Sequence, residues 1–172
     1  MSNKTQIIVI ADKIRSLYNV GSIFRTCDGI GAKKLYLIGY TATPKTKPIQ
    51  IHKTALGADE TVDWEHAKTV GPLINKLKKQ GFEIVALEEK EGTSQDYRDW
   101  KPGKKVAIIL GNEVTGISTQ LLKKCDKVVH LPMGGEKKSL NVSVAFGAIG
   151  YYLVSKSKCI EASRGKSKKI AI

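Results

Sequence analysis

The sequence predicts an α/β fold in which helices cover both faces of a mainly parallel sheet. Short apolar runs, typical of strands buried on both faces, alternate along the chain with segments of helical periodicity. The 172 residues suit one domain of ordinary size. Hydrophobic residues make up 41% and charged residues 26%, which is the balance of a globular protein. We expect one domain over residues 1–155, followed by a basic tail over 156–172.

The expected strands are short apolar runs bounded by glycine, proline or polar residues. The first is rich in isoleucine and valine and begins within a few residues of Met1. A stretch between the second strand and the next helix holds two prolines, three lysines and three threonines, and it predicts an exposed loop over residues 41–53. The strands are expected at residues 6–11, 34–40, 61–64, 82–87, 106–110 and 128–131.

Helical periodicity marks the segments between these strands. Residues 19–31 carry apolar side chains at three- and four-residue steps, with Asn19 as a candidate N-cap and Gly31 as a stop. Residues 70–80 place leucine and isoleucine on one face and lysines on the other. A short helix at 119–124 and a last helix at 141–155 complete the expected elements.

The net charge points to the class of partner. Lys and Arg number 29 against 16 Asp and Glu, which gives +13. Six basic residues and one acidic residue after position 155 supply +5, so +8 remains on the predicted domain. Such an excess favours a polyanion, most often a nucleic acid, although solubility and a basic tail are the plainer explanation.

The sequence also argues against several classes of protein. Three cysteines without a CxxC pair and three scattered histidines indicate neither a disulfide framework nor a metal site, so a reducing cytoplasm is expected. The longest uncharged apolar stretch, residues 140–155, is too short and polar to span a membrane. No secretory signal is visible at the amino terminus. The residues concerned are Cys27, Cys125, Cys159, His52, His66 and His130.

Three glycine-containing loops follow expected strands, at residues 87–92, 110–118 and 131–141. Ligands of parallel sheets bind beyond the carboxyl ends of the strands, and glycine lets backbone approach a ligand closely. Together the loops predict a pocket with leucine and methionine walls that suits an adenine-like ring. For any single loop, ordinary turn chemistry is the plainer interpretation. Neither a P-loop nor a GxGxxG turn is present.

A fourth segment, from Asn19 to Arg25, starts at the end of the first strand. The free N–H groups and positive dipole of a helix start point toward the expected pocket. Arg25 stands on a largely apolar helix, where an arginine more often extends to solvent or pairs with an acid.

These segments closely resemble the SpoU/TrmH family of RNA ribose 2′-O-methyltransferases, within the SPOUT class. Residues 19–31 resemble the first family motif, with its Asn and Arg. Residues 109–117 resemble the second, and residues 131–145 the third, with Pro-Met-x-Gly followed by Ser-Leu-Asn. The likeness spans roughly residues 6–155 and includes residues 54–58.

The resemblance implies a deep trefoil knot formed by the carboxy-terminal third of the chain. It implies S-adenosylmethionine bound in the knot, S-adenosylhomocysteine as product, no metal, and a homodimer whose active site uses both subunits. Arg25 corresponds to the catalytic arginine, while Asn19, Glu113, Ser139 and Asn141 shape the reacting site. The residues implied to hold the cofactor are Leu87, Gly111, Leu131, Met133, Ser139 and Leu140.

The expected reaction is methyl transfer to a ribose 2′-hydroxyl of tRNA or rRNA. Alternatives are methylation of an RNA base and an RNA-binding module without catalysis. Arginine stays protonated, so Arg25 is expected to clamp a phosphate and not to act as a base. Capping of the last helix remains an alternative role for Ser139 and Asn141, and a structural role remains one for Glu113. Glu88 and Glu89 are expected to face solvent.

Overall fold

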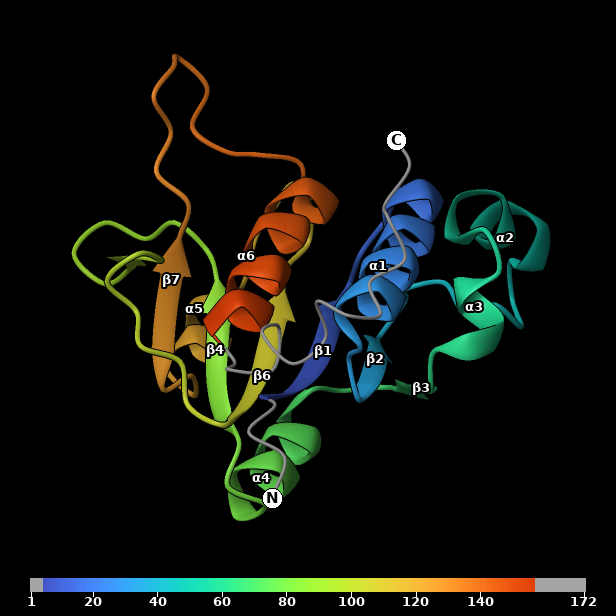
Figure 1. Ribbon diagram of the computed structural model, residues 1–172, viewed down its shortest axis with the longest axis horizontal. Helices are drawn as coiled ribbons and strands as arrows, with labels where there is room; N and C mark the ends of the chain where they lie inside the picture. The colour runs from blue at the N-terminus through green and yellow to red at the C-terminus, as the bar shows by residue number, and fades with distance from the viewer. Residues whose placement is uncertain (1–4, 157–172) are drawn as a thin grey trace, which may run out of the picture.

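The computed structural model describes residues 5–156 and confirms the predicted α/β fold (Figure 1). All seven strands are parallel, in the order β3-β2-β1-β6-β4-β7-β5. Hydrophobic runs such as Lys105–Leu110 form the central strands, because both faces of a parallel sheet are covered. The strands are β1 (Gln6–Asp12), β2 (Lys34–Ile38), β3 (Trp64–Ala67), β4 (Glu83–Leu87), β5 (Gln95–Asp96), β6 (Lys105–Leu110) and β7 (Lys127–His130).

Two layers of helices sandwich the sheet. Alternate residues of β1 point to opposite faces, so Ile7 and Val9 join one apolar core while Ile8 and Ile10 join the other. The first core is covered by α1 (Leu17–Ile30), α2 (Pro48–Ala55), α3 (Ala58–Thr61) and α6 (Val142–Lys156). The second is covered by α4 (Gly71–Lys79) and α5 (Thr119–Leu122).

The strand register brings four strand ends to one level. Ala11 of β1 pairs with Leu110 of β6, which pairs with Leu87 of β4, which in turn pairs with Val129 of β7. The loops that follow these strands therefore meet at one edge of the sheet, as the sequence predicts for a parallel arrangement. α4 lies at the opposite end of the molecule from the loop at residues 131–141 (Figure 1).

Helix α1 begins earlier than expected. Ser16, not Asn19, is its N-cap, and the Ser16 hydroxyl accepts a hydrogen bond from the Asn19 N–H. Asn19 lies within the first turn, where its side chain is free for another role. Gly31 ends the helix in the left-handed conformation, as predicted.

The expected exposed loop at residues 41–53 was wrong in its second half. Pro48 starts α2, because proline fits the first helical position, where no N–H partner is needed. The strand expected at 61–64 is also displaced. Residues up to Thr61 form α3, and β3 begins only at Trp64.

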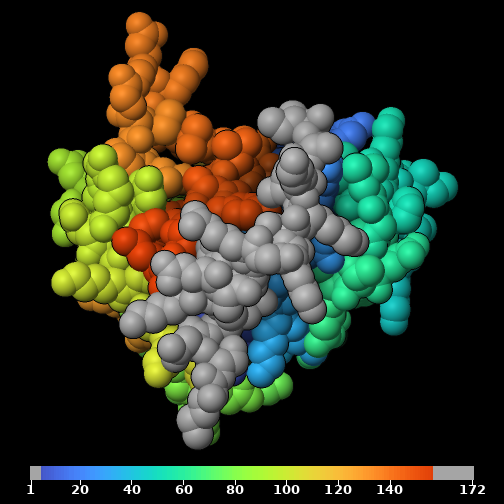
Figure 2. All heavy atoms as spheres, viewed as in Figure 1, coloured from blue at the N-terminus to red at the C-terminus, as the bar shows by residue number. Residues whose placement is uncertain are grey.

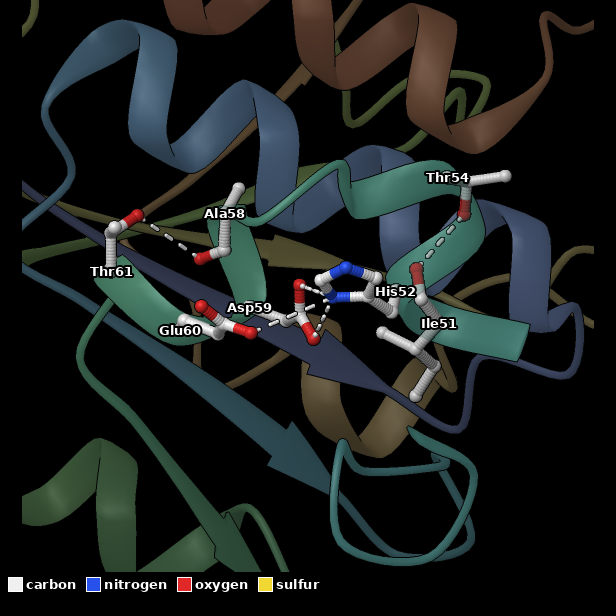
Figure 3. Close-up of polar contacts among 7 residues, drawn as sticks. All are labelled: Ile51, His52, Thr54, Ala58, Asp59, Glu60 and Thr61. Atoms are coloured by element: carbon white, nitrogen blue, oxygen red, sulfur yellow. Dashed lines mark hydrogen bonds and ion pairs between the residues drawn. The ribbon is translucent and has the colours of Figure 1, made fainter. Parts of the chain in front are cut away.

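A hydrogen-bonded turn joins α2 and α3 (Figure 3). Leu56 and Gly57 both have positive φ, which reverses the chain. The His52 ring nitrogen Nδ1 then lies 3.2 Å from a carboxylate oxygen of Asp59, and Glu60 stands beside the pair. This contact fixes the two short helices against each other, and both lie on the side of α1 away from α6 (Figure 1).

The carboxy-terminal helix is held by the long segment after β4. The Tyr97 and Tyr152 rings meet edge to face at 5.2 Å, and the Tyr152 hydroxyl donates to the Trp100 carbonyl over 2.6 Å. This contact fits the knot that the resemblance implies, and the knot itself stays a prediction. α6 ends at Lys156, and the rest of the predicted tail lies outside the described residues. Between residues 5 and 156, no helix has the length and apolar character needed to cross a bilayer.

Candidate functional site

A cavity of about 270 Å³ opens where the loops after β4, β6 and β7 meet the start of α6. We call it the strand-end pocket. The loop at residues 131–141, which forms one wall, stands out from the body of the molecule (Figure 2). The pocket is lined by Leu87, Glu88, Glu89, Gly111, Asn112, Glu113, Val114, Gly116, His130, Leu131, Lys138, Ser139, Leu140, Asn141, Val142 and Ala145.

The pocket brings together most of the predicted site residues. Of those expected to hold the cofactor, only Met133 lies outside the lining. Of those expected to shape the reaction, Asn19 and Arg25 lie outside it, and Asn19 contacts two residues that line it. The predicted residues that do line the pocket are Leu87, Gly111, Glu113, Leu131, Ser139, Leu140 and Asn141.

Two glycines let the loop after β6 fold tightly on itself. A Cβ on Gly111 would lie 2.5 Å from Ile117 Cγ1 and 2.7 Å from the Gly116 carbonyl carbon. Gly116 has a φ of 63°, which side chains rarely adopt. Both positions therefore require glycine if this wall of the pocket is to keep its shape.

The expectation that Glu88 faces solvent was wrong. Its carboxylate accepts a hydrogen bond of 2.8 Å from the Ile117 N–H, which ties the loop after β4 to the loop after β6. Glu89 is exposed, as expected. Nothing in the local pattern distinguishes these neighbouring acids, since the contact depends on the packing of two distant loops.

Three predicted residues form one hydrogen-bond network beside the pocket. Asn19 Nδ2 donates to Glu113 Oε1 over 2.9 Å, and Asn141 Nδ2 donates to Asn19 Oδ1 over 3.1 Å. The network joins the start of α1 to the loop after β6, 94 residues further on, and to the start of α6, 122 residues further on. Each amide therefore has a fixed orientation at the mouth of the pocket.

Glu113 also holds the start of α1. Its two carboxylate oxygens accept the N–H groups of Arg15 at 2.9 Å and Ser16 at 3.0 Å. Burial raises the pKa of the Glu113 carboxyl, but these bonds and the one from Asn19 outweigh burial, and the pKa is lowered. Glu113 therefore has the structural role that the sequence left open, and the same carboxylate positions the Asn19 side chain.

Asn141 caps α6 while it takes part in the network. Its Oδ1 accepts the Ser143 N–H at 2.9 Å, and its Nδ2 remains for Asn19. Capping and site geometry are therefore not alternatives at this position. Ser139 makes no hydrogen bond within residues 5–156, so it does not cap the helix, and its hydroxyl remains available to a ligand.

Arg25 lies apart from the pocket. It is exposed on the outward side of α1, which also carries Tyr18 and Gly29, and it forms no ion pair within the described part of the chain. The Tyr151 hydroxyl of α6 lies close above Gly29. Arg25 therefore stands on the outer surface formed by α1 and α6.

Asn112 and His130 are among the lining residues that sequence reasoning did not single out. Asn112 Oδ1 accepts the N–H groups of Val114 and Thr115, and its Nδ2 donates to the Tyr40 hydroxyl. Asn112 stands between Gly111 and Glu113, and this position could have marked it as a site residue. Asparagine is common in turns, however, so the position alone did not distinguish it. His130 lies 3.0 Å from the Ser94 hydroxyl, a contact that the sequence does not indicate.

The lining fits an adenosine-containing ligand. Leu87, Leu131 and Leu140 supply apolar walls from three separate segments, and the glycine loop brings backbone between them. The carboxylates of Glu88 and Glu113 are already bonded to backbone N–H groups. Within residues 5–156, no group of His, Cys, Asp and Glu is arranged to hold a metal ion.

Comparison with known proteins assigns the family. The model of the SpoU rRNA Methylase family matches residues 6–151. The fold and pocket therefore define a SpoU-type α/β protein. The chain belongs to the SpoU rRNA Methylase family.

Three relatives illustrate the match. A tRNA (guanosine(18)-2'-O)-methyltransferase of Aquifex aeolicus is 36% identical over 146 residues, which cover 84% of this chain and 67% of the relative. An AdoMet-bound rRNA methyltransferase from Sinorhizobium meliloti has a TM-score of 0.78 at 26% identity, with 96% of this chain and 58% of that chain covered. The SpoU methyltransferase AviRb from Streptomyces viridochromogenes, in complex with AdoMet, has a TM-score of 0.79 at 26% identity, covering 89% and 58%. The chain thus spans about three fifths to two thirds of these relatives.

Proposed function

We propose that the protein transfers a methyl group from S-adenosylmethionine to a ribose 2′-hydroxyl of tRNA or rRNA. One observation carries the proposal: the leucine-walled pocket and the Glu113–Asn19–Asn141 network share their edge, so donor and acceptor sites adjoin. Family membership and the AdoMet-bound relatives support the same reading. The charge of +13 suits an RNA substrate.

The donor supplies an electrophilic methyl group on a sulfonium when it is bound. Leu87, Leu131 and Leu140 hold its adenosine part, and the backbone of Gly111 lies beside them. A ribose hydroxyl is a weak nucleophile, so alignment matters most and contributes at best about 7–11 kcal/mol. The fixed amides of Asn19 and Asn141 are suited to hold the ribose in that alignment.

Arg25 acts on the RNA phosphate in this proposal. Its guanidinium stays protonated, so it binds the phosphate next to the target ribose and favours the developing alkoxide. It does not line the pocket of its own chain. The residue therefore works from a second subunit.

A homodimer is supported by the outer surface of α1 and α6. Tyr18, Val144 and Tyr151 are 61%, 56% and 48% exposed there. α6 is apolar on its outward side as well as its inward side, which is unusual for a helix facing water. A second copy of the chain covers this surface in the proposed dimer, and Arg25 lies within the surface.

The proposed location is the cytoplasm, where tRNA and rRNA are found. Cys27 and Cys125 are free thiols, which suits that reducing compartment.

The test combines binding with product analysis. Calorimetry should show binding of S-adenosylmethionine by the purified protein, and nucleosides from treated tRNA or rRNA should contain a new 2′-O-methyl group. A methyl group on a base would favour the base-methylating alternative. RNA binding without uptake of S-adenosylmethionine would leave only the non-catalytic RNA-binding module.

A further inference from the structure

A second hollow lies at the same edge of the sheet as the strand-end pocket. It is lined by residues 39–43, 45–47 and 64–66, and we call it the Tyr40 groove. Residues 39–47 follow β2 and residues 64–66 belong to the edge strand β3, whereas the strand-end pocket follows β4, β6 and β7. Because all the strands are parallel, the loop after β2 leaves the sheet at the same edge as the loops of the strand-end pocket. The roles proposed so far do not use this groove.

Tyr40 connects the groove to the pocket. Its hydroxyl accepts a hydrogen bond of 2.9 Å from Nδ2 of Asn112, and Asn112 lines the strand-end pocket. The same Nδ2 donates to the Lys13 carbonyl at 2.8 Å. Tyr40 is nevertheless 61% exposed. An aromatic ring is thus held by its hydroxyl while most of its surface remains open to solvent.

Hydrogen bonds from buried threonines tie the loop that forms the groove. The buried Thr41 hydroxyl accepts the Ile14 N–H at 2.9 Å and donates to the Ile38 carbonyl at 2.8 Å. Thr43 and Thr46 bond each other through side chain and backbone. Tyr40, Lys45 and Lys47 therefore lie on a turn that is already formed without a ligand.

The groove carries unpaired positive charge. Lys45 and Lys47 line it and form no salt bridge with any described residue. Glu65 is the acid in the lining, and Lys34 Nζ binds its carboxylate at 3.1 Å. Lys45 and Lys47 are therefore not neutralised by Glu65, whose carboxylate is already paired with Lys34.

We propose that the Tyr40 groove binds the single-stranded RNA segment next to the methylated nucleotide. The Tyr40 ring stacks on a base, and Lys45 and Lys47 contact the flanking phosphates. An open aromatic ring beside cations is the combination that binds single-stranded RNA without sequence preference. The inference rests on the proposed function, which places the reacting ribose at the strand-end pocket. The Tyr40–Asn112 bond holds the Tyr40 ring beside that pocket.

The test measures the dissociation constant of unfractionated tRNA, and of rRNA in a parallel arm, for variants of the full chain. Tyr40→Ala should weaken binding about 5- to 150-fold, the range for loss of one stacked base. Tyr40→Phe keeps the ring but loses the bond to Asn112, and it should weaken binding less than Tyr40→Ala does. Should Tyr40→Ala unfold, Tyr40→Leu replaces it, because leucine keeps the apolar bulk without a stacking ring.

The lysines are tested by salt dependence. Lys45→Ala/Lys47→Ala should reduce the slope of log affinity against log salt by about 1.4, since each phosphate contact on a single strand contributes about 0.7. The matched control is Lys76→Ala/Lys79→Ala, which removes the same charge from the exposed side of α4 and should leave the slope near that of the parent. Equal slopes for the two double variants, with Tyr40→Ala binding like the parent, would overturn the inference.

The two proposals fail separately. Loss of the proposed function appears in the unaltered protein, as absent uptake of S-adenosylmethionine or absent methyl transfer. Failure of the groove appears only in the comparison of variants, while the unaltered protein still methylates RNA. Affinity for S-adenosylmethionine should stay within about twofold in every groove variant, since none of these side chains lines the strand-end pocket.

Discussion

Glu113 shows how one carboxylate can shape a site without touching the reacting atoms. It accepts the N–H groups of Arg15 and Ser16 and the side-chain amide of Asn19. Replacing Glu113 with Ala should lower the free energy of unfolding by about 1–2 kcal/mol, as for loss of a helix cap. Urea unfolding measures this change, and Asn75→Ala, on the exposed side of α4, is the control.

The contribution of Glu113 should depend on pH. Its pKa is lowered in the folded protein from an ordinary value of 4.5, so its stabilisation is fully present above that value. The stabilisation is then lost as the pH falls through the folded pKa. The stability difference between the parent and Glu113→Gln should therefore shrink below pH 4.5. A difference that is constant from neutral to strongly acidic pH would contradict this assignment.

At this scale the sequence predicted residue types better than contacts. Glycines after strands pointed to the pocket, because strand ends and turn chemistry are local properties. The carboxylate–backbone bonds of Glu88 and Glu113 were out of reach, because each joins loops brought together only by the whole sheet. Met133 was carried over from the family motif, and its side chain lies outside the pocket lining.

Among the elements, α1 and α2 pack closely against each other at Gly21. A Cβ there would lie 2.6 Å from the backbone carbonyl oxygen of Ile51, which cannot move aside as a side chain can. Gly21→Ala should therefore destabilise the protein by about 1–3 kcal/mol, the usual effect of overpacking. Thermal unfolding would show a lower midpoint.

A matched substitution separates packing from helix propensity. Gly71 lies in the first turn of α4, and its Cβ would meet only the Lys124 amine at ordinary contact distance. Gly71→Ala should leave stability unchanged or raise it by up to about 1 kcal/mol. Equal losses for the two variants would argue against close packing as the cause at Gly21.

Helix periodicity predicted the long helices and the short helix α5, but other short elements were missed. Leu73, Ile74 and Leu77 face the core in α4, as their spacing indicated. α2 was hidden because Pro48 suggests a loop until its place as the first helical residue is known. β5 has two residues, too few for any alternation to appear.

For the whole molecule, the decisive question is whether two chains share a site. Arg25→Ala and Asn141→Ala should each abolish most activity alone. If Arg25 serves the partner's pocket, a mixed dimer contains one intact site, and an equal mixture should recover about a quarter of the parent activity. If each pocket uses its own Arg25, the mixture should stay as inactive as its components.

The same surface allows a direct check of assembly. Val144→Glu places a charge on the exposed apolar side of α6. Sedimentation equilibrium should then report a mass near 18.8 kDa, the mass of one chain, where the parent gives about twice that value. A parent protein that is already monomeric would exclude the shared site.

The hydrogen bonds from Glu113 through Asn19 to Asn141 have a consequence for motion. They anchor the first turns of α1 and α6 to the hairpin-like bend after β6, so none of the three can shift alone. The projecting loop at residues 131–138 takes no part in this hydrogen-bond network. We therefore expect a large ligand to enter the pocket by displacement of this loop. Hydrogen exchange is expected to be fast along residues 131–138 and slow at both helix starts. The loop would then move to admit the ligand while the starts of α1 and α6 stay in place.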